Sequence, residues 1–444
     1  MRYLKLHFCI FNFINHLIEL DMRNFIISIY FVLSIIINSF AQSKTSTTIK
    51  TEALVPEFKL PELLISENGS QIKTKETWEQ VRRPEILELF ANQVYGKVPG
   101  KLTFHKAEVL DYSDQALGNK AIRKQVALHF KKGSKSILIV VLMYLPKRVK
   151  NAPVFLGYNF SGNHAVHADP AILIGAKTLA QLSPSELSKL KPDSRGKRNS
   201  RWQADKIVAA GYGLVTVDYG NVDPDKNDFS DGIHILFYEE NQKSPEPHQW
   251  GSLAAWAWGM SRVMDYLETD TLVDEKSVIL FGHSRLGKTA LWAGASDSRF
   301  SIVISNNSGC GGAALSRRRF GEKVSNINTK FPHWFAKNFH QYNENETDLP
   351  IDQHMLIALI APRPVYVASA SLDLWADPNG EFLSAKAATP VYELYGKKGI
   401  EVDQQPAVNT PIHNMIGYHL REGKHNVTDY DWDQYIQFSN LHLH

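Results

Sequence analysis

The sequence predicts an open α/β fold built around a buried sheet, and three observations lead to this prediction. Short runs rich in β-branched residues recur along the 444-residue chain, helical stretches separate them, and one run leads directly into a Gly-x-Ser turn. Apolar runs of this length are typical of parallel strands covered on both faces. Strands that alternate with helices favour a single α/β sheet over a sandwich or a bundle.

The expected elements begin with a helix over 78–94, and the β-rich pattern starts near residue 121. Strands are expected at 126–130, 137–145, 153–158, 213–219, 277–282, 301–305 and 365–370. Helices are expected among them at 203–210, 250–268, 286–296 and 352–361. Two connections, 165–200 and 307–350, are too long for simple loops, so we interpret them as insertions around a site.

The N-terminal region has the pattern of a secretory signal. Met22 and a basic residue precede an apolar run of about 13 residues, which is too short for a comfortable membrane span of about 20. Small residues follow, so we expect cleavage near Ala41 and a true start at Met22, with an uncleaved anchor as the alternative. The expected organisation is a signal segment over 1–41, a linker or arm over 42–75, and a single catalytic domain over 76–444. The mature protein is then secreted or periplasmic, without stable membrane insertion.

Charge and cysteine content exclude other classes. The formal net charge is +3, and no run of five or more Lys or Arg occurs, so we expect no nucleic-acid partner. Cys310 is the one cysteine after the signal segment, so no internal disulfide can form. We interpret Cys310 as a small buried residue, with a nucleophile as the alternative.

The Gly-x-Ser turn indicates a nucleophile. Gly282-His283-Ser284-Arg285-Leu286-Gly287 follows an apolar run and opens a helix, in the pattern of a nucleophile elbow whose second glycine falls one place late. Gly282 lets neighbouring backbone approach, and the amide of Arg285 at the helix start can face a developing oxyanion. The alternative is an ordinary turn in which Ser284 caps the helix.

A serine nucleophile needs a base and an acid, and in this kind of site they follow the serine in chain order as acid and then histidine. His425 lies in a glycine-containing loop late in the chain, and His419 is its nearest competitor. Asp373 follows the run over 365–370 and is the expected acid, with Asp377 as the weaker candidate. The earlier strand-end slot holds Asn307, which is not acidic.

Several motifs in order resemble the bacterial glucuronoyl esterases of carbohydrate esterase family 15. The likeness covers roughly residues 80–440 and rests on Asn159-Phe160-Ser161-Gly162-Asn163-His164, Trp250-Gly251-Ser252-Leu253-Ala254-Ala255-Trp256-Ala257-Trp258, Gly282-His283-Ser284-Arg285-Leu286-Gly287-Lys288, Phe331-Pro332-His333-Trp334-Phe335 and Ala361-Pro362-Arg363-Pro364. The resemblance implies an α/β-hydrolase fold, a three-layer α/β/α sandwich that needs no metal or cofactor. It implies a serine esterase that cleaves esters between 4-O-methyl-glucuronic acid of glucuronoxylan and lignin alcohols.

The resemblance also implies roles for individual residues. Ser284 and His425 match the nucleophile and base, and Arg285 matches the residue that stabilises the oxyanion. Residues that hold the sugar are matched by Lys288, Glu322 and Trp375. Taken singly, these three also fit a solvated lysine, a partner of a nearby arginine and a core anchor.

One position departs from the pattern of many family members, which carry a glutamate as the triad acid where this chain has Asn307. Other bacterial members resemble this chain in placing an aspartate after the later strand, so the expected triad is Ser284-His425-Asp373. The rival functions are an acetyl-xylan esterase or broad carboxylesterase, and an inactive carbohydrate-binding protein on the same fold. A monomer is expected.

Overall fold

A single sheet organises the part of the chain that the structure describes. The computed structural model describes residues 48–176 and 194–443, and the sheet belongs to the compact unit that begins at Ile49. The strands are β1 (Lys106–Gln115), β2 (Ala121–Lys132), β3 (Lys135–Pro146), β4 (Ala152–Asn159), β5 (Gly213–Asp218), β6 (Val273–His283), β7 (Ile302–Asn306), β8 (Val365–Ala370), β9 (Ile412–His413) and β10 (Ile416–Arg421).

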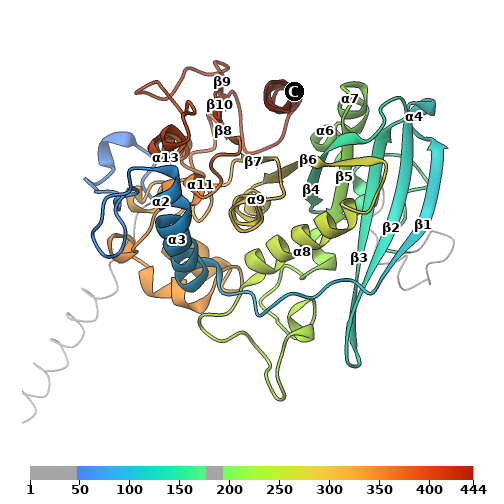
Figure 1. The fold of residues 1–444 in the computed structure, drawn as a ribbon, viewed down its shortest axis with the longest axis horizontal. Coiled ribbons are helices and arrows are strands. Elements are labelled where there is room, and N and C mark those ends of the chain that lie inside the picture. Colours follow the sequence, from blue (N-terminus) through green and yellow to red (C-terminus); the bar gives the residue numbers. More distant parts are fainter. Residues whose placement is uncertain (1–47, 177–193, 444) are drawn as a thin grey trace, which may run out of the picture. The chain divides into compact units, whose positions relative to one another are not determined.

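The strand order is β1-β2-β3-β5-β4-β6-β7-β8-β10-β9 (Figure 1). The strands from β5 to β10 in this order run parallel, whereas β1, β2, β3 and β9 pair antiparallel at the two sides. Parallel strands end at the same edge of a sheet, so the segments that follow β5, β6, β7, β8 and β10 share one rim. Ligand sites of open α/β sheets form at this carboxyl edge.

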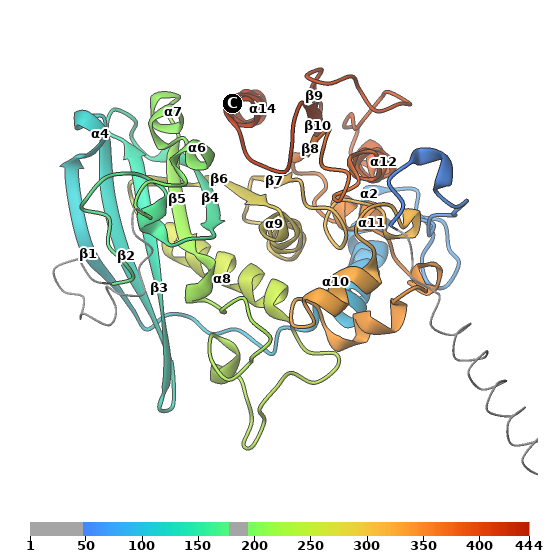
Figure 2. The ribbon, with the colours of Figure 1, turned by 180° about the vertical axis from the view of Figure 1, so that it is seen from behind.

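Helices cover both faces of the sheet, as the two opposite views show (Figures 1 and 2). The helices α8 and α9 lie on one face, and α6, α7 and α14 lie on the other. The bounds are α2 (Lys75–Thr77), α3 (Arg83–Phe90), α4 (Ala116–Asn119), α6 (Asn199–Trp202), α7 (Ala204–Ala209), α8 (Ser252–Leu267), α9 (Arg285–Ser296), α10 (Val324–Lys330), α11 (Gln353–Ala358), α12 (Pro378–Ala387), α13 (Thr389–Leu394) and α14 (Asp429–His442).

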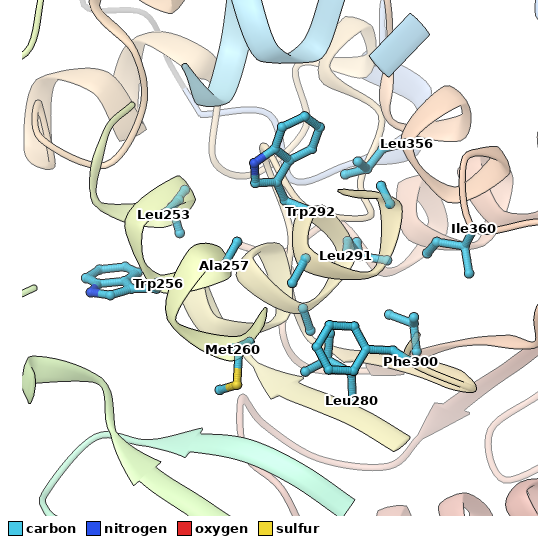
Figure 3. Close-up of a cluster of buried hydrophobic side chains, with 14 of the residues drawn as sticks. Leu253, Trp256, Ala257, Met260, Leu280, Leu291, Trp292, Phe300, Leu356 and Ile360 are labelled. Atoms are coloured by element: carbon cyan, nitrogen blue, oxygen red, sulfur yellow. The ribbon is translucent and has the colours of Figure 1, made fainter. Parts of the chain in front are cut away.

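The side chains of β6 contribute to two hydrophobic cores, one on each face of the sheet, because successive side chains of a strand point to opposite faces. Val278 and Leu280 join the larger core under α8 and α9, whereas Ile279 and Phe281 join the smaller core under α6, α7 and α14. Figure 3 shows the larger core around Leu280. Burial of each large apolar side chain stabilises the fold by roughly 1.5–3 kcal/mol, so these two cores fix β6 and the turn that follows it.

Every expected strand is present, with bounds that differ by a few residues. The expected helices at 203–210, 250–268, 286–296 and 352–361 correspond to α7, α8, α9 and α11, and the stretch from Lys75 to Tyr95 is helical with wide turns within it. The sequence did not predict β1, β9, β10, α12, α13 or α14. The sequence did not indicate β1 because its residues are half-buried or exposed along its whole length. It therefore lacks the apolar run on which the strand predictions depended.

The signal segment and much of the 165–200 connection lie outside the described residues. Within the described ranges, no helix is long and apolar enough to cross a membrane. Part of the expected linker packs on the catalytic unit: Leu63 and Ile72 are buried in the larger core, and His354 Nε2 lies 3.1 Å from the carbonyl oxygen of Pro61.

Candidate active site

Ser284 lies at a tight turn between β6 and α9. Its backbone φ of +60° and ψ of −130° is a conformation that side chains other than glycine rarely adopt, and such strain is typical of functional positions. A Cβ on Gly282 would lie 1.9 Å from the Leu286 carbonyl oxygen, so this turn requires glycine there. The Ser284 side chain makes no capping hydrogen bond to α9, which argues against the ordinary helix cap.

The second glycine of the turn, Gly287, faces β7. A Cβ there would lie 3.0 Å from the Ser308 Cβ and 3.2 Å from the Ser305 hydroxyl. The late position of this glycine relative to the usual elbow pattern therefore matches a close approach between α9 and the segment after β7. The first amides of α9, beginning with Arg285, lack intrahelical acceptors and are available at the carboxyl rim of the sheet.

Asp373 and His425 meet at this rim, although they follow different strands. Asp373 Oδ2 accepts a hydrogen bond of 2.5 Å from His425 Nδ1. The same oxygen accepts a second hydrogen bond, of 3.0 Å, from Asn307 Nδ2. Asp373 is buried, whereas the His425 side chain is 41% exposed and can reach a bound molecule. The arrangement fixes which ring nitrogen faces the carboxylate and leaves Nε2 for the nucleophile side.

All seven site residues predicted from the sequence line one cavity of about 320 Å³. The predicted residues are Ser284, Arg285, Lys288, Glu322, Asp373, Trp375 and His425, and the other residues of its wall are Asn307, Ser308, Gly309, Lys330, Phe331, Trp334 and Ala376. Within the described structure no hydrogen bond joins the Ser284 hydroxyl to His425, as is common before a substrate is bound. Two larger cavities, of about 610 and 730 Å³, have no histidine in their walls, so size alone does not mark the site.

Arg285 is held in place by the half-buried carboxylate of Asp225. Its Nη1 donates to Asp225 Oδ2, and its guanidinium lies 4.6 Å from the centre of the Trp334 ring and 5.3 Å from that of Phe331. Asp225 also accepts from Trp334 Nε1 at 2.7 Å and from His333 Nε2 at 2.9 Å. Burial alone would raise the pKa of Asp225, but the hydrogen bonds from His333 and Trp334 and the Arg285 charge lower it to about 2. The carboxylate therefore stays charged and orients Arg285 towards the cavity.

Lys288 and Glu322 form a buried ion pair on the cavity wall. Lys288 Nζ lies 3.9 Å from Glu322 Oε2 and donates to the Ser308 carbonyl oxygen. Burial lowers the pKa of Lys288, and the Glu322 charge opposes this effect. Lys288 is thus not the solvated helix residue considered as an alternative. Trp375 is 40% exposed at the cavity, so it is not a core anchor.

The competing candidates lie elsewhere. His419 is buried, and its Nε2 lies 3.0 Å from Oδ1 of Asp431 in α14. Neither residue lines the cavity. Asp377 accepts from Arg318 and caps α12. Cys310 is buried, and burial raises the pKa of its thiol, which makes it a poor nucleophile.

Sequence reasoning missed two contributions to the site. It did not identify Asp225, and it did not identify Asn307 as a hydrogen-bond donor to Asp373. Asp225 lies in the segment after β5, another strand end of the parallel block, and this position was the available signal. Asn307 was recognised only as the residue that replaces an acid. The structure shows its amide donating to the acid from the neighbouring strand.

Comparisons with known proteins agree with this geometry. Residues 202–396 match the family model of fungal glucuronyl esterases. A carbohydrate esterase of an unknown prokaryotic organism is 50% identical over 398 residues, which are 88% of this chain and 91% of that protein. The structure of a glucuronoyl esterase from Solibacter usitatus is 47% identical, with a TM-score of 0.83, over 88% of this chain and 100% of that one. The chain belongs to the glucuronoyl esterases of carbohydrate esterase family 15.

Two further relatives show the range of this family. The structure of a promiscuous family 15 esterase from a marine bacterial metagenome is 48% identical, with a TM-score of 0.79, over 89% of this chain and 100% of that one. A 4-O-methyl-glucuronoyl methylesterase from Schizophyllum commune is 29% identical over 81% of this chain and 80% of its own. This glucuronoyl esterase is therefore a carboxylic ester hydrolase with an α/β-hydrolase fold, and the expected fold and enzyme class are confirmed.

Proposed function

We propose that this protein is a secreted serine esterase that hydrolyses the ester bonds between 4-O-methyl-glucuronic acid of glucuronoxylan and alcohols of lignin. The observation that carries the proposal is the meeting of Ser284, His425 and Asp373 with the Lys288–Glu322 pair around one cavity. The choice of substrate is supported by the relative from Schizophyllum commune, which is named a 4-O-methyl-glucuronoyl methylesterase. No cofactor takes part in the proposed reaction.

The first step forms an acyl-enzyme. His425 Nε2 takes the proton of Ser284 Oγ as this oxygen attacks the ester carbonyl carbon, and the electron pair moves to the carbonyl oxygen. The Arg285 amide and guanidinium stabilise that negative oxygen, while Asp373 stabilises the imidazolium. When the tetrahedral intermediate collapses, the bond to the lignin alcohol breaks and His425 returns the proton to the leaving oxygen.

The second step releases the glucuronate. His425 takes a proton from water, the hydroxide adds to the acyl carbon, and Ser284 Oγ leaves with a proton from the histidine. The charged Lys288–Glu322 pair offers a donor and an acceptor to sugar hydroxyls, and Trp375 offers a ring face to sugar C–H groups. These contacts favour a sugar acid over a simple acyl group.

The nucleophile is tested first by Ser284→Ala. We expect this variant to lose at least about 1,000-fold in kcat on benzyl glucuronate while its unfolding temperature stays close to that of the wild type. The measurement is initial-rate kinetics beside a thermal melt. Wild-type turnover in a folded Ser284→Ala protein contradicts the assignment of the nucleophile.

A second candidate, a broad carboxylesterase that includes acetyl-xylan among its substrates, is favoured by one observation. The 48% identical relative is described as promiscuous. Parallel assays of benzyl glucuronate and 4-nitrophenyl acetate separate the two candidates, because a higher kcat/KM on acetate favours the broad esterase. The inactive carbohydrate-binding alternative rests on the Asn307 replacement, and hydrolysis of either ester rejects it.

The proposal extends to where the enzyme acts and in what form. The signal pattern before Ala41 supports export to the periplasm or the medium, and we propose that the mature chain acts as a monomer. Gel filtration with light scattering measures the oligomeric state. N-terminal sequencing of protein recovered from the culture medium or periplasm measures the cleavage site.

A further inference from the structure

The loop that carries His425 curls around one buried side chain, that of Arg421. Arg421 is the last residue of β10 and is 3% exposed. Its Nη1 donates to the carbonyl of Glu422 at 2.9 Å, and its Nη2 donates to the carbonyls of Lys424 at 2.8 Å and Asn426 at 2.6 Å. Three carbonyls within five consecutive residues therefore converge on one guanidinium, and two of them belong to the residues on either side of His425.

The Arg421 guanidinium is itself held by a buried carboxylate, that of Asp431. Arg421 Nε donates to Asp431 Oδ2 at 2.8 Å, and Asp431 is fully buried near the start of α14. Asp431 also accepts from the amide and hydroxyl of Thr428, both at 2.7 Å. Asn306, the last residue of β7, donates from its Nδ2 to Asp431 Oδ1 at 3.1 Å. Arg421 thus connects the helix, the strand ends and the catalytic loop through a single rigid planar group.

The same loop is joined to the segment that carries Asp373. The Ser371 amide donates to the Arg421 carbonyl at 2.9 Å, and the Leu372 amide donates to the Gly423 carbonyl at 2.9 Å. Gly423 has a φ of +105°, and a Cβ there would lie 3.4 Å from Arg421 Nη1. These two hydrogen bonds therefore fix the backbone next to Asp373 relative to the backbone next to His425. The Arg421 guanidinium fills the inside of the loop that carries His425.

We propose that Arg421 is a positioning residue that sets the His425 imidazole between Asp373 and Ser284. Arg421 does not line the cavity, so it acts through the loop and not on the substrate. The inference rests on the proposed role of His425 as base. A planar fork with several donors can satisfy three carbonyls and a carboxylate together, which a lysine or an amide cannot. A shift of about 1 Å in a catalytic group can cost about 100-fold in rate.

The test is Arg421→Gln beside a matched control, Arg363→Gln. Arg363 is half-buried and likewise donates to three backbone carbonyls, those of Gly294, Asp297 and Phe300, and it lies outside the cavity wall. Loss of either arginine removes a similar set of hydrogen bonds. We expect Arg421→Gln to lower kcat on benzyl glucuronate about 10- to 100-fold with little change in KM. Arg363→Gln is expected to lower the unfolding temperature and leave kcat unchanged.

The variant is expected to fold, because Asp431 keeps its donors from Thr428, Asn306 and His419. If Arg421→Gln does not fold, Asp431→Asn perturbs the same anchor with little change of shape. A lower kcat at unchanged KM in that variant supports the inference, and a wild-type kcat overturns it. Wild-type kcat in folded Arg421→Gln, or an equal loss of kcat in Arg363→Gln, also overturns it.

The same variants are assayed with 4-nitrophenyl acetate, which separates this inference from the proposed substrate. Wild-type activity on acetate alone rejects the glucuronate substrate, yet the effect of Arg421 on kcat is still measured. Full activity of Ser284→Ala on both esters rejects the catalytic site itself. A kcat loss confined to Arg421→Gln on an ester that the wild type hydrolyses supports the positioning role.

Discussion

At the scale of single residues, the proposed acid, Asp373, accepts from two donors. Asp373 Oδ2 accepts from His425 at 2.5 Å and from Asn307 at 3.0 Å. A second carboxylate at position 307 would lie against Asp373 and repel it, whereas the amide of Asn307 donates a hydrogen bond to Asp373. Asn307 is therefore compatible with an acid at Asp373, and its presence does not imply an inactive site.

The variant Asp373→Asn tests this arrangement. An amide in place of the carboxylate can turn its nitrogen towards His425 and no longer stabilises the imidazolium, so we expect kcat to fall about 1,000- to 10,000-fold. KM and the unfolding temperature are expected to change little. Steady-state kinetics on benzyl glucuronate measure the effect, with Asp403→Asn, at a surface ion pair with Lys386, as the control. An unchanged kcat in Asp373→Asn would require a different acid.

At the scale of elements, the turn between β6 and α9 is strongly constrained. Ser284 adopts a positive φ, and Gly282 and Gly287 allow the helix to approach the strand and its neighbour. The two cores hold β6 from both faces, so the strain at Ser284 cannot relax by movement of the strand. The proposed nucleophile, which is half-buried, is therefore held at the rim without a supporting hydrogen bond to α9.

Gly282→Ala tests the geometric requirement of that turn. The added methyl would meet the backbone oxygen of Leu286, and a backbone atom cannot move aside as a flexible side chain can. We expect a loss of about 3 kcal/mol or more in the free energy of unfolding, together with loss of activity. Gly220→Ala, whose new Cβ would meet nothing closer than 3.4 Å, is the control. Denaturant unfolding compares the two, and equal stability would show that the turn tolerates a side chain.

At the scale of the whole molecule, the site exists because the segments that follow five of the six parallel strands meet at one rim. Under this rim, Glu381 of α12 connects two of the converging segments. It accepts from Ser369 of β8 at 2.6 Å and from the Gly309 amide, after β7, at 2.9 Å. Glu381 is fully buried, and burial raises its pKa to about 8, with a further increase from the Asp373 charge.

This raised pKa predicts a pH dependence of stability. Glu381 in the unfolded chain titrates near its ordinary value of 4.5, so between pH 4.5 and about 8 the folded protein keeps a proton that the unfolded chain releases. The contribution of Glu381 to stability is thus full below pH 4.5 and is lost as pH rises towards 8, by at most about 1.4 kcal/mol per pH unit. Glu381→Gln is expected to flatten this part of the profile. Denaturant unfolding across the same pH range measures it, and identical slopes in both proteins would contradict the prediction.

The sequence by itself determined the strands of the parallel block other than β10, the turn at Ser284 and the candidate residues Ser284, Asp373 and His425. These features carry local signals: an apolar run, a glycine pair, or an acid or histidine just after a strand. The resemblance carried by several motifs in order added the enzyme class and the candidate sugar-binding residues Lys288, Glu322 and Trp375. The half-exposed strand β1 lacked such a signal, and so did β10, in which glycine, histidine and arginine interrupt the apolar residues, so their pairing partners make them strands.

Only the tertiary structure decided how the site is supported. Asn307 meets Asp373 across 66 positions of sequence, and Asp225 meets Arg285 across 60. Arg421 has its acceptors close in sequence, yet its role depends on a loop conformation fixed by α14 and β8. These contacts depend on strand order and helix packing, which bring the ends of separate strands together. A sequence pattern can identify the candidate reacting groups. The residues that position them are in contact with them only in the folded chain, so the sequence pattern does not identify those residues.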